Sequence, residues 1–361
     1  MCGIFGYLNY LVKRDRRFIA DILMNGLHRL EYRGYDSSGI AFDGDNIEEN
    51  NNNKRACIVV RQKGKVEELE HAVKSLENID WNGEFSIHVG IAHTRWATHG
   101  EPSAVNSHPQ RSDEQNQFVC VHNGIITNYK DIKQYLINKN YIFESETDTE
   151  VVIKLVKYLY DKHKNENIGF QKLIEMACSQ LEGAFALLFK SIHYPGQLCA
   201  TRRGSPMVIG VKCADAFGSN HIPVMFSKDL RGVFSPPLLI TDQATTDLTV
   251  AGNDRSIEYY FASDASAIIE HTNQVIFMED DDLAVVNNVL ARGGQPVLIC
   301  NDDDEELIKI APRYITVPCT VDCLQGILCV VPMQLLSFHI AVLRGYDVDC
   351  PRNLAKSVTV A

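Results

Sequence analysis

The sequence has no excess of basic residues, because 35 lysines and arginines stand against 46 aspartates and glutamates, for a formal net charge of −11. A protein that binds nucleic acid nonspecifically needs a basic face, so the composition argues against that class. The eleven cysteines include no repeated C-x-x-C pairs of the zinc-site type, and no apolar secretory segment follows Met1. We therefore expect reduced thiols and a cytoplasmic location.

The chain is 361 residues long and 45% apolar, which is enough for one large domain or two ordinary ones. It contains no internal repeat. The uncharged stretch 324–343 is near the minimum length for a membrane span. It contains Pro332 and several polar residues, however, and these favour a buried core helix. We expect no association with a membrane.

The apolar periodicity predicts a chain that mixes helices and strands. Strands are expected at 3–8, 57–61, 86–94, 118–122, 184–190, 197–201, 206–212, 259–262, 274–278, 296–300 and 314–317. Helices are expected over 15–32, over 66–76, and through residue 160 after an N-cap at Asp148 and Thr149.

Three further expectations concern local detail. The helix over 15–32 should bury one face made of Phe18, Ile19, Ile22, Leu23, Leu27 and Leu30. The three strands between 184 and 212 should form a meander. Residues 43–55 and 214–256 should be surface segments without regular structure.

Cys2 directly follows the initiator methionine. Removal of Met1 would leave Cys2 with a free α-amine, whose pKa is ordinarily ~7.7–8. Such an amine can act as general base for its own residue's thiol at neutral pH. Taken alone, a cysteine at position 2 is more simply explained as a small packed hydrophobe.

Five motifs in one order change that interpretation. They are MCGIFGY at 1–7, EYRGYDSSG at 31–39, HTRWATHGEP at 93–102, HNGII at 122–126 and SETDTE at 145–150. Together they resemble the class II glutamine amidotransferases, a branch of the N-terminal nucleophile hydrolases. Within that class, the third and fifth motifs resemble the glutamine–fructose-6-phosphate aminotransferase (isomerising) family, which makes glucosamine-6-phosphate for UDP-N-acetylglucosamine synthesis. The resemblance implies an α+β fold with a four-layer αββα sandwich over residues 1–286.

The resemblance also implies how the chain would hydrolyse L-glutamine. Cys2 would attack the side-chain amide, while Asn123 and the backbone N–H of Gly124 would form the oxyanion hole that acyl transfer requires. Arg95 resembles the clamp for the α-carboxylate, because its planar fork matches a carboxylate in two bonds. Asp148 resembles the partner of the substrate ammonium.

Other residues of the same motifs are expected around the substrate. Thr98, His99 and Gly100 would line the pocket, and Trp96 resembles the mobile aromatic residue that gates the passage of ammonia. Arg33 resembles the residue that orients the terminus of the nucleophile.

The residues alone leave other interpretations open. Arg95 and Asp148 could be ordinary surface ion pairs, and Asn123-Gly124 could be a type I′ hairpin turn. A second set could suggest a metal site: His88, His93, His99, His108 and His122. Their spacing fits no helical ligand pair with a carboxylate, so we expect neither a metal nor a cofactor.

The C-terminal part resembles the end of the same enzyme at 321–326, 332–339, 344–349 and 351–360. Lys356 resembles the lysine that forms a Schiff base with the sugar in that family. The phosphate-binding loops and the acid and base groups that open the sugar are not found in the sequence. We therefore expect residues 287–361 to be a remnant of the sugar isomerase domain, a partial α/β fragment.

Two hypotheses about function follow. The first is a glutaminase that acts on L-glutamine and meets fructose-6-phosphate only through a full-length partner. The second is a non-catalytic fragment that associates with a full-length synthase as a homo- or hetero-oligomer. Another amidotransferase is disfavoured, because the chain has no nucleotide loop of the Walker type and those families do not end in NLAKSVTV.

Overall fold

The computed structural model describes residues 2–46, 55–77, 79–97, 100–166, 168–213 and 256–286, together with the backbone of two short strands at 298–301 and 314–317. The chain divides into two compact units. The first consists of residues 1–217 and 254–288, and the second of residues 218–253 and 289–361.

The first unit alternates strands and helices along the chain. In order it contains β1 (Gly3–Asp15), α1 (Arg16–Leu30), η1 (Glu31–Arg33), β2 (Ser37–Asn46), β3 (Arg55–Lys63), α2 (Val66–Lys74), β4 (Glu84–Arg95), β5 (Gln110–Arg111), β6 (Phe118–Ile126), α3 (Tyr129–Ile137) and α4 (Asp148–Lys162). It continues with η2 (Lys164–Glu166), α5 (Phe170–Cys178), β7 (Gly183–Ser191), β8 (Leu198–Arg203), β9 (Val208–Cys213), β10 (Ile257–Ala262), η3 (Ala265–Ala267), β11 (Val275–Phe277) and β12 (Leu283–Val286).

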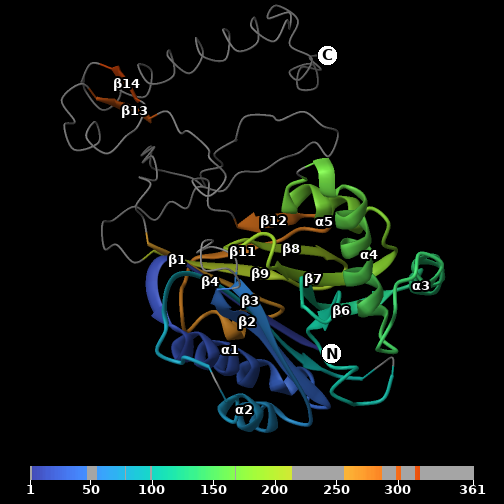
Figure 1. The fold of residues 1–361 in the computed structure, drawn as a ribbon. Coiled ribbons are helices and arrows are strands. Elements are labelled where there is room, and N and C mark those ends of the chain that lie inside the picture. Colours follow the sequence, from blue (N-terminus) through green and yellow to red (C-terminus); the bar gives the residue numbers. More distant parts are fainter. Residues whose placement is uncertain are drawn as a thin grey trace, which may run out of the picture. The chain divides into compact units, whose positions relative to one another are not determined.

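The strands of the first unit form two antiparallel sheets (Figure 1). The seven-stranded sheet has the order β11-β9-β10-β1-β4-β2-β3, and the five-stranded sheet has the order β12-β8-β7-β6-β5. The sheets face each other closely, since a Cβ added to Gly6 of β1 would lie 2.5 Å from Leu188 Cδ2 of β7. An ion pair between Asp43 of β2 and Lys190 of β7 also joins them.

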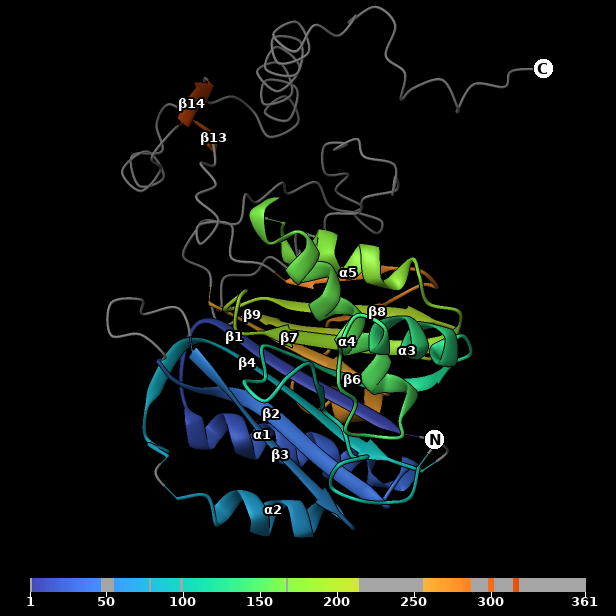
Figure 2. The same cartoon turned by 45° about the vertical axis from the view of Figure 1, so that its right-hand side comes forward.

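Helices cover the two outer faces. Helices α1 and α2 lie against the seven-stranded sheet, while α4 and α5 lie against the five-stranded sheet with α3 packed on α4 (Figure 2). The first unit is therefore a four-layer αββα sandwich with one apolar core on the outer side of each sheet. This layering confirms the predicted architecture for the described part of residues 1–286.

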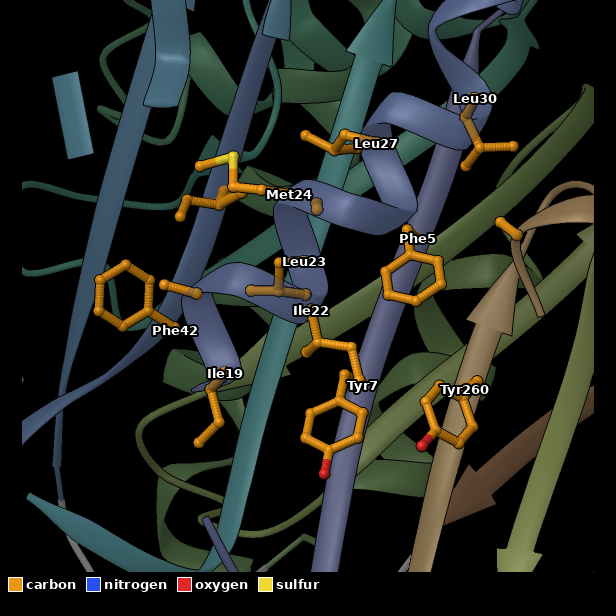
Figure 3. Close-up of a cluster of buried hydrophobic side chains, with 14 of the residues drawn as sticks. Phe5, Tyr7, Ile19, Ile22, Leu23, Met24, Leu27, Leu30, Phe42 and Tyr260 are labelled. Carbon is orange, nitrogen blue, oxygen red and sulfur yellow. The ribbon is translucent and has the colours of Figure 1, made fainter. Parts of the chain in front are cut away.

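Helix α1 shows how local sequence fixes one of these cores. Asp15 caps the helix, because its Oδ1 accepts from the backbone N–H of Phe18 at 2.7 Å. Ile19, Leu23 and Leu27 recur every four residues and bury one face against the sheet (Figure 3). Phe18, which was expected on that face, is instead 37% exposed. It lies at the edge of the stripe, where the Arg14 guanidinium sits 4.4 Å from its ring centroid.

The structure corrects three other expectations. Strand β9 does not continue a meander from β8, because it joins the other sheet between β10 and β11. Residues 43–46 belong to β2 rather than to a surface segment, and 47–54 lie outside the described residues. The N-cap of α4 is Thr147, whose Oγ1 accepts from Glu150 N at 3.4 Å, so Asp148 and Thr149 are the first residues of the helix.

The second unit is described only by the parallel pair of β13 (Leu298–Asn301) and β14 (Tyr314–Val317), which confirms the two strands predicted there. No helix among the described residues has the length and apolar character needed to cross a bilayer. The uncharged stretch 324–343 and residues 214–255 lie outside the described residues.

Candidate active site

Cys2 immediately precedes β1, where the register of the sheet brings it beside β4. The next residue, Gly3, pairs with Thr94, so Cys2 lies next to the last residues of β4 and to Trp96. The backbone N–H of Trp96 donates to Cys2 Sγ at 3.3 Å. Two side chains hold the Cys2 carbonyl oxygen: Arg33 Nε donates to it at 3.2 Å and Asn123 Nδ2 at 3.0 Å. The nucleophile predicted from sequence is thus anchored at both its sulfur and its backbone.

The surroundings of Cys2 keep its thiol protonated at neutral pH. Burial raises the pKa of the thiol above its ordinary value, and Asp148 raises it further. The hydrogen bond from Trp96 and the positive charge of Arg95 act in the opposite direction without cancelling the effect of burial. Because the thiolate is the reactive form of cysteine, a reaction at this thiol would need a base to remove the proton.

Asn123 and Gly124 lie inside β6, where they pair with Ala186 and Phe185 of β7. The interpretation of this dipeptide as a hairpin turn is therefore wrong. Gly124 has φ +120°, and a Cβ at this position would lie 2.0 Å from the Ala184 carbonyl oxygen. Only glycine fits both the left-handed backbone and the close approach of the neighbouring strand.

The Asn123 side chain bridges Cys2 and a buried histidine. Its Nδ2 donates to the Cys2 carbonyl oxygen, and its Oδ1 lies 3.0 Å from His93 Nε2. One hydrogen of the Asn123 amide is thereby used on the backbone of Cys2. The second hydrogen on Nδ2 is available to an oxygen that develops charge near the nucleophile.

Besides Arg33, two charged groups act on Cys2, Arg95 and Asp148, and both are buried, at 4% and 6% exposure. The interpretation as ordinary surface ion pairs is therefore wrong. Arg95 donates to the Gly100 carbonyl oxygen at 3.2 Å, and Asp148 Oδ2 accepts from Ile126 N at 2.8 Å. Each also acts electrostatically on Cys2 and on the other. One buried cation and one buried anion beside Cys2 suit a zwitterionic ligand.

Trp96 combines a fixed backbone with an exposed ring. Its side chain is 43% exposed and lies edge-on to Tyr35, with ring centroids 5.4 Å apart. The following residue, Ala97, is fixed by its N–H, which donates to Asp36 Oδ2 at 2.8 Å. The expected pocket residues Thr98 and His99 lie outside the described residues, as does Lys356.

Arg33 is oriented by a residue that sequence reasoning missed. Its guanidinium forms an ion pair with Asp264 at 2.9 Å while its Nε donates to Cys2, and Tyr32 donates to the same carboxylate at 2.6 Å. Asp264 follows β10, 231 residues after Arg33, and no local signal marks it. Only the pairing of β10 with β1 brings it to the site.

The histidines do not form a metal site in the part of the chain that the structure describes. No group of three or more histidine, cysteine, aspartate or glutamate side chains is arranged to hold an ion there. His93, His108 and His122 do lie near one another: His93 Nε2 faces carbonyl and amide oxygens and His108 Nδ1, and His122 Nδ1 lies 2.8 Å from the Thr149 hydroxyl and 3.9 Å from Asp148 Oδ1.

The comparisons with known proteins agree with this geometry. The sequence profile of a family described as "Glutamine amidotransferase domain" matches residues 93–219. With the anchored cysteine and its two buried charges, this match defines the protein as one that carries a glutamine amidotransferase domain. More particularly, the chain is a homologue of the glutamine–fructose-6-phosphate aminotransferases (isomerizing).

Two relatives give the extent of the likeness. Glutamine–fructose-6-phosphate aminotransferase (isomerizing) 1 of Rattus norvegicus is 54% identical over 288 residues, which cover 79% of this chain and 42% of the rat protein. The probable glutamine–fructose-6-phosphate aminotransferase (isomerizing) of Schizosaccharomyces pombe is 45% identical over 312 residues, which cover 80% of this chain and 43% of the yeast protein. The match therefore spans less than half the length of these relatives. Among solved structures, the glutamine phosphoribosylpyrophosphate amidotransferase of B. subtilis aligns with 87% of this chain and 65% of its own chain, at 18% identity and a TM-score of 0.47.

Proposed function

We propose that the chain hydrolyses L-glutamine to L-glutamate and ammonia, with Cys2 as the nucleophile. The observation that carries this proposal is the anchoring of Cys2 by Asn123 and Arg33 between the buried charges of Arg95 and Asp148. The Cys2 thiol is partly buried, has a raised pKa and lies beside charged groups. It is well suited to a reaction in which a base removes its proton.

The base in this proposal is the α-amine that Cys2 gains when Met1 is removed. The amine takes the thiol proton as Sγ attacks the side-chain carbonyl carbon of glutamine, and the carbonyl oxygen becomes an oxyanion. Asn123 Nδ2 and the Gly124 N–H donate to that oxyanion, each contributing about 3 kcal/mol to the transition state. Collapse of the intermediate breaks the C–N bond, and the protonated amine returns its proton to the departing ammonia.

The γ-glutamyl thioester that remains is then hydrolysed. Water attacks the same carbonyl carbon, the amine takes a proton from it, and the oxyanion is stabilised by the same two donors. When this intermediate collapses, the C–S bond breaks and glutamate leaves. The proton returns to Cys2 Sγ, so the enzyme is regenerated with no net change.

Recognition of glutamine rests on the two buried charges. Arg95 binds the α-carboxylate in two bonds, and Asp148 binds the α-ammonium. Thr98, His99 and Gly100 are assigned to glutamine binding by their place in the motif, the first two lying outside the described residues, and Arg33 orients the terminus of Cys2. Trp96 gates the passage of ammonia, a role for which its half-exposed ring beside a fixed backbone is suitable.

The wider role of the chain is part of the proposal. Residues 1–286 form the glutaminase domain of a cytoplasmic N-terminal nucleophile hydrolase, and residues 287–361 are a remnant of the sugar isomerase domain. Lys356 alone cannot isomerise a sugar, because Schiff-base chemistry needs a second acid or base group. Conversion of fructose-6-phosphate to glucosamine-6-phosphate then requires a full-length partner.

The alternative is a non-catalytic fragment that associates with a full-length synthase as a homo- or hetero-oligomer. The observation in its favour is that the match spans only 42% of the rat relative. Association without turnover would distinguish it from the glutaminase.

The test is release of glutamate by purified protein whose intact mass shows that Met1 has been removed. Wild type should release glutamate from glutamine, while Cys2→Ala should release none. Cys2→Ser is the matched control, since it keeps the α-amine and the shape of the side chain but replaces sulfur with a poorer nucleophile. Wild-type release no faster than that of Cys2→Ala would refute the proposal. Co-purification with a full-length synthase in that case would favour the fragment.

A further inference from the structure

Three buried imidazole rings lie near one another close to the Asn123 side chain. They belong to His93 on β4, His108 on the segment that leads to β5, and His122 on β6. The ring centroids of His93 and His108 are 4.3 Å apart, and those of His108 and His122 are 6.4 Å apart. The proposed reaction assigns none of them a part, yet one of them contacts the amide that would stabilise the oxyanion.

The surroundings of His93 decide which ring nitrogen carries the hydrogen. His93 Nε2 lies 2.9 Å from the carbonyl oxygen of His122, 3.0 Å from Asn123 Oδ1 and 3.3 Å from His108 Nδ1. The two nearer groups are carbonyl oxygens, which can only accept, so Nε2 carries the hydrogen and the more distant His108 Nδ1 faces it as an acceptor. Without it, two oxygen lone pairs would face a nitrogen lone pair in a buried site. The other nitrogen, Nδ1, has no partner among the described residues, as suits a ring atom without a hydrogen.

This tautomer in turn fixes the orientation of the Asn123 amide. On one side the Cys2 carbonyl oxygen accepts and needs the Nδ2 group 3.0 Å away. On the other side the N–H of His93 donates and needs Oδ1. A 180° turn of the amide would set oxygen against oxygen at Cys2 and N–H against N–H at His93. Both neighbours therefore select the one orientation in which Nδ2 faces the nucleophile.

We propose that His93 is a positioning residue that acts through Asn123, holding its amide with Nδ2 toward Cys2 for the oxyanion. The inference rests on the glutaminase reaction proposed above. His93 contacts no reacting atom in this scheme. Its hydrogen bond to Oδ1 removes the alternative orientation, which would place an acceptor where the oxyanion forms.

The neutrality of the ring agrees with this role. Burial lowers the pKa of His93 to about 3, so the imidazole is uncharged at neutral pH. A neutral ring with a single N–H gives a fixed donor without placing a full charge behind the Asn123 amide.

The first test is kinetic and uses the full chain. His93→Phe removes the donor and keeps a buried ring, and we expect kcat to fall about 10–100-fold with a smaller change in KM. His93→Gln places an amide N–H near the Nε2 position and should restore most of the loss. His88→Phe is the matched control, because His88 is also a buried histidine of β4 but bonds the backbone of Asp43 instead.

Alkylation of Cys2 by iodoacetamide separates positioning from general damage. That reaction occurs at a saturated carbon and forms no oxyanion, so His93→Phe should alkylate at the wild-type rate. If His93→Phe keeps the wild-type kcat, or loses no more than His88→Phe, the inference is overturned. If the wild type itself releases no glutamate, the proposed function fails instead.

The second test does not depend on turnover. In protein labelled with ¹⁵N-histidine, the signals of His93 should be those of a neutral ring with the hydrogen on Nε2 and a bare Nδ1. A hydrogen on Nδ1 would overturn the inference even in an active enzyme. If the protein shows the expected tautomer but releases no glutamate, the positioning of the Asn123 amide by His93 stands and the proposed glutaminase reaction is refuted.

Discussion

Replacement of Gly124 by alanine tests the proposed oxyanion hole most severely. The added Cβ would lie 2.0 Å from the Ala184 carbonyl oxygen, so β6 and β7 must separate by 1 Å or more to reach an allowed contact. The left-handed backbone, at φ +120°, adds strain of about 1–2 kcal/mol for a residue with a Cβ. With about 1–3 kcal/mol for the overpacking, we expect Gly124→Ala to lose about 2–5 kcal/mol of stability.

The catalytic effect should exceed what the loss of stability explains. A shift of about 1 Å in the Gly124 N–H and the neighbouring Asn123 amide should lower kcat by about 100-fold in the folded fraction. Gly183→Ala is the matched control, because Gly183 has φ +114° and its Cβ would lie 2.2 Å from the Ile125 carbonyl oxygen on the same pair of strands. Urea unfolding gives the stability of both variants, and glutamate release under conditions that keep them folded gives kcat. A folded Gly124→Ala whose kcat equals that of Gly183→Ala would refute the assigned oxyanion hole.

Three further predictions concern binding, the anchor of the nucleophile and stability in acid. Arg95→Lys should raise KM for glutamine by about tenfold or more with a smaller effect on kcat, because lysine offers a point charge in place of a two-bond fork; a fall in kcat at unchanged KM would contradict the binding role. Asp264→Asn should lower kcat by about tenfold, since Arg33 loses the charge that holds it at the Cys2 carbonyl. Tyr32→Phe keeps that ion pair and should change kcat less; equal losses in the two variants would refute the argument. Burial lowers the pKa of both His88 and His93 to about 3, so these rings stay neutral in the fold while the unfolded chain takes up protons below pH 6.5. The contribution of the two neutral rings to stability is complete above pH 6.5. As the pH falls from 6.5 to 3, the free energy of unfolding should fall by about 1.4 kcal/mol per pH unit for each ring. Urea titrations at several pH values would measure this slope. If the slope in His88→Phe equals that of the wild type, His88 does not contribute to it and the argument is contradicted.

Local patterns predicted those parts of the fold that local physics determines. The four-residue spacing of Ile19, Leu23 and Leu27 identified α1, and the apolar runs located most of the strands. The sheet that each strand joins depends on long-range pairing, which leaves no local signal. For this reason the predicted meander of β8 and β9 is wrong, because β9 pairs with β10 and β11.

The residues of the candidate site likewise fall into those that stand in local motifs and those whose role depends on long-range contacts. Cys2, Arg95 and Asn123 stand in motifs that can be recognised along the chain, and the structure brings them together. Asp264 carries no local signal, since it contacts Arg33 from 231 residues away. His93 begins a recognisable motif, but only the structure shows its contact with Asn123 on the facing sheet. Supporting groups of this kind are selected by geometry rather than by local spacing.

Acid-quenched mass spectrometry of the protein during turnover tests the central claim most directly. Wild type mixed with excess glutamine and quenched within one turnover should carry one γ-glutamyl group on the peptide that begins with Cys2. The group should be released by hydroxylamine, as expected for a thioester, and should be absent from Cys2→Ala. Glutamate release without any adduct on Cys2, or release that persists in Cys2→Ala, would contradict the account.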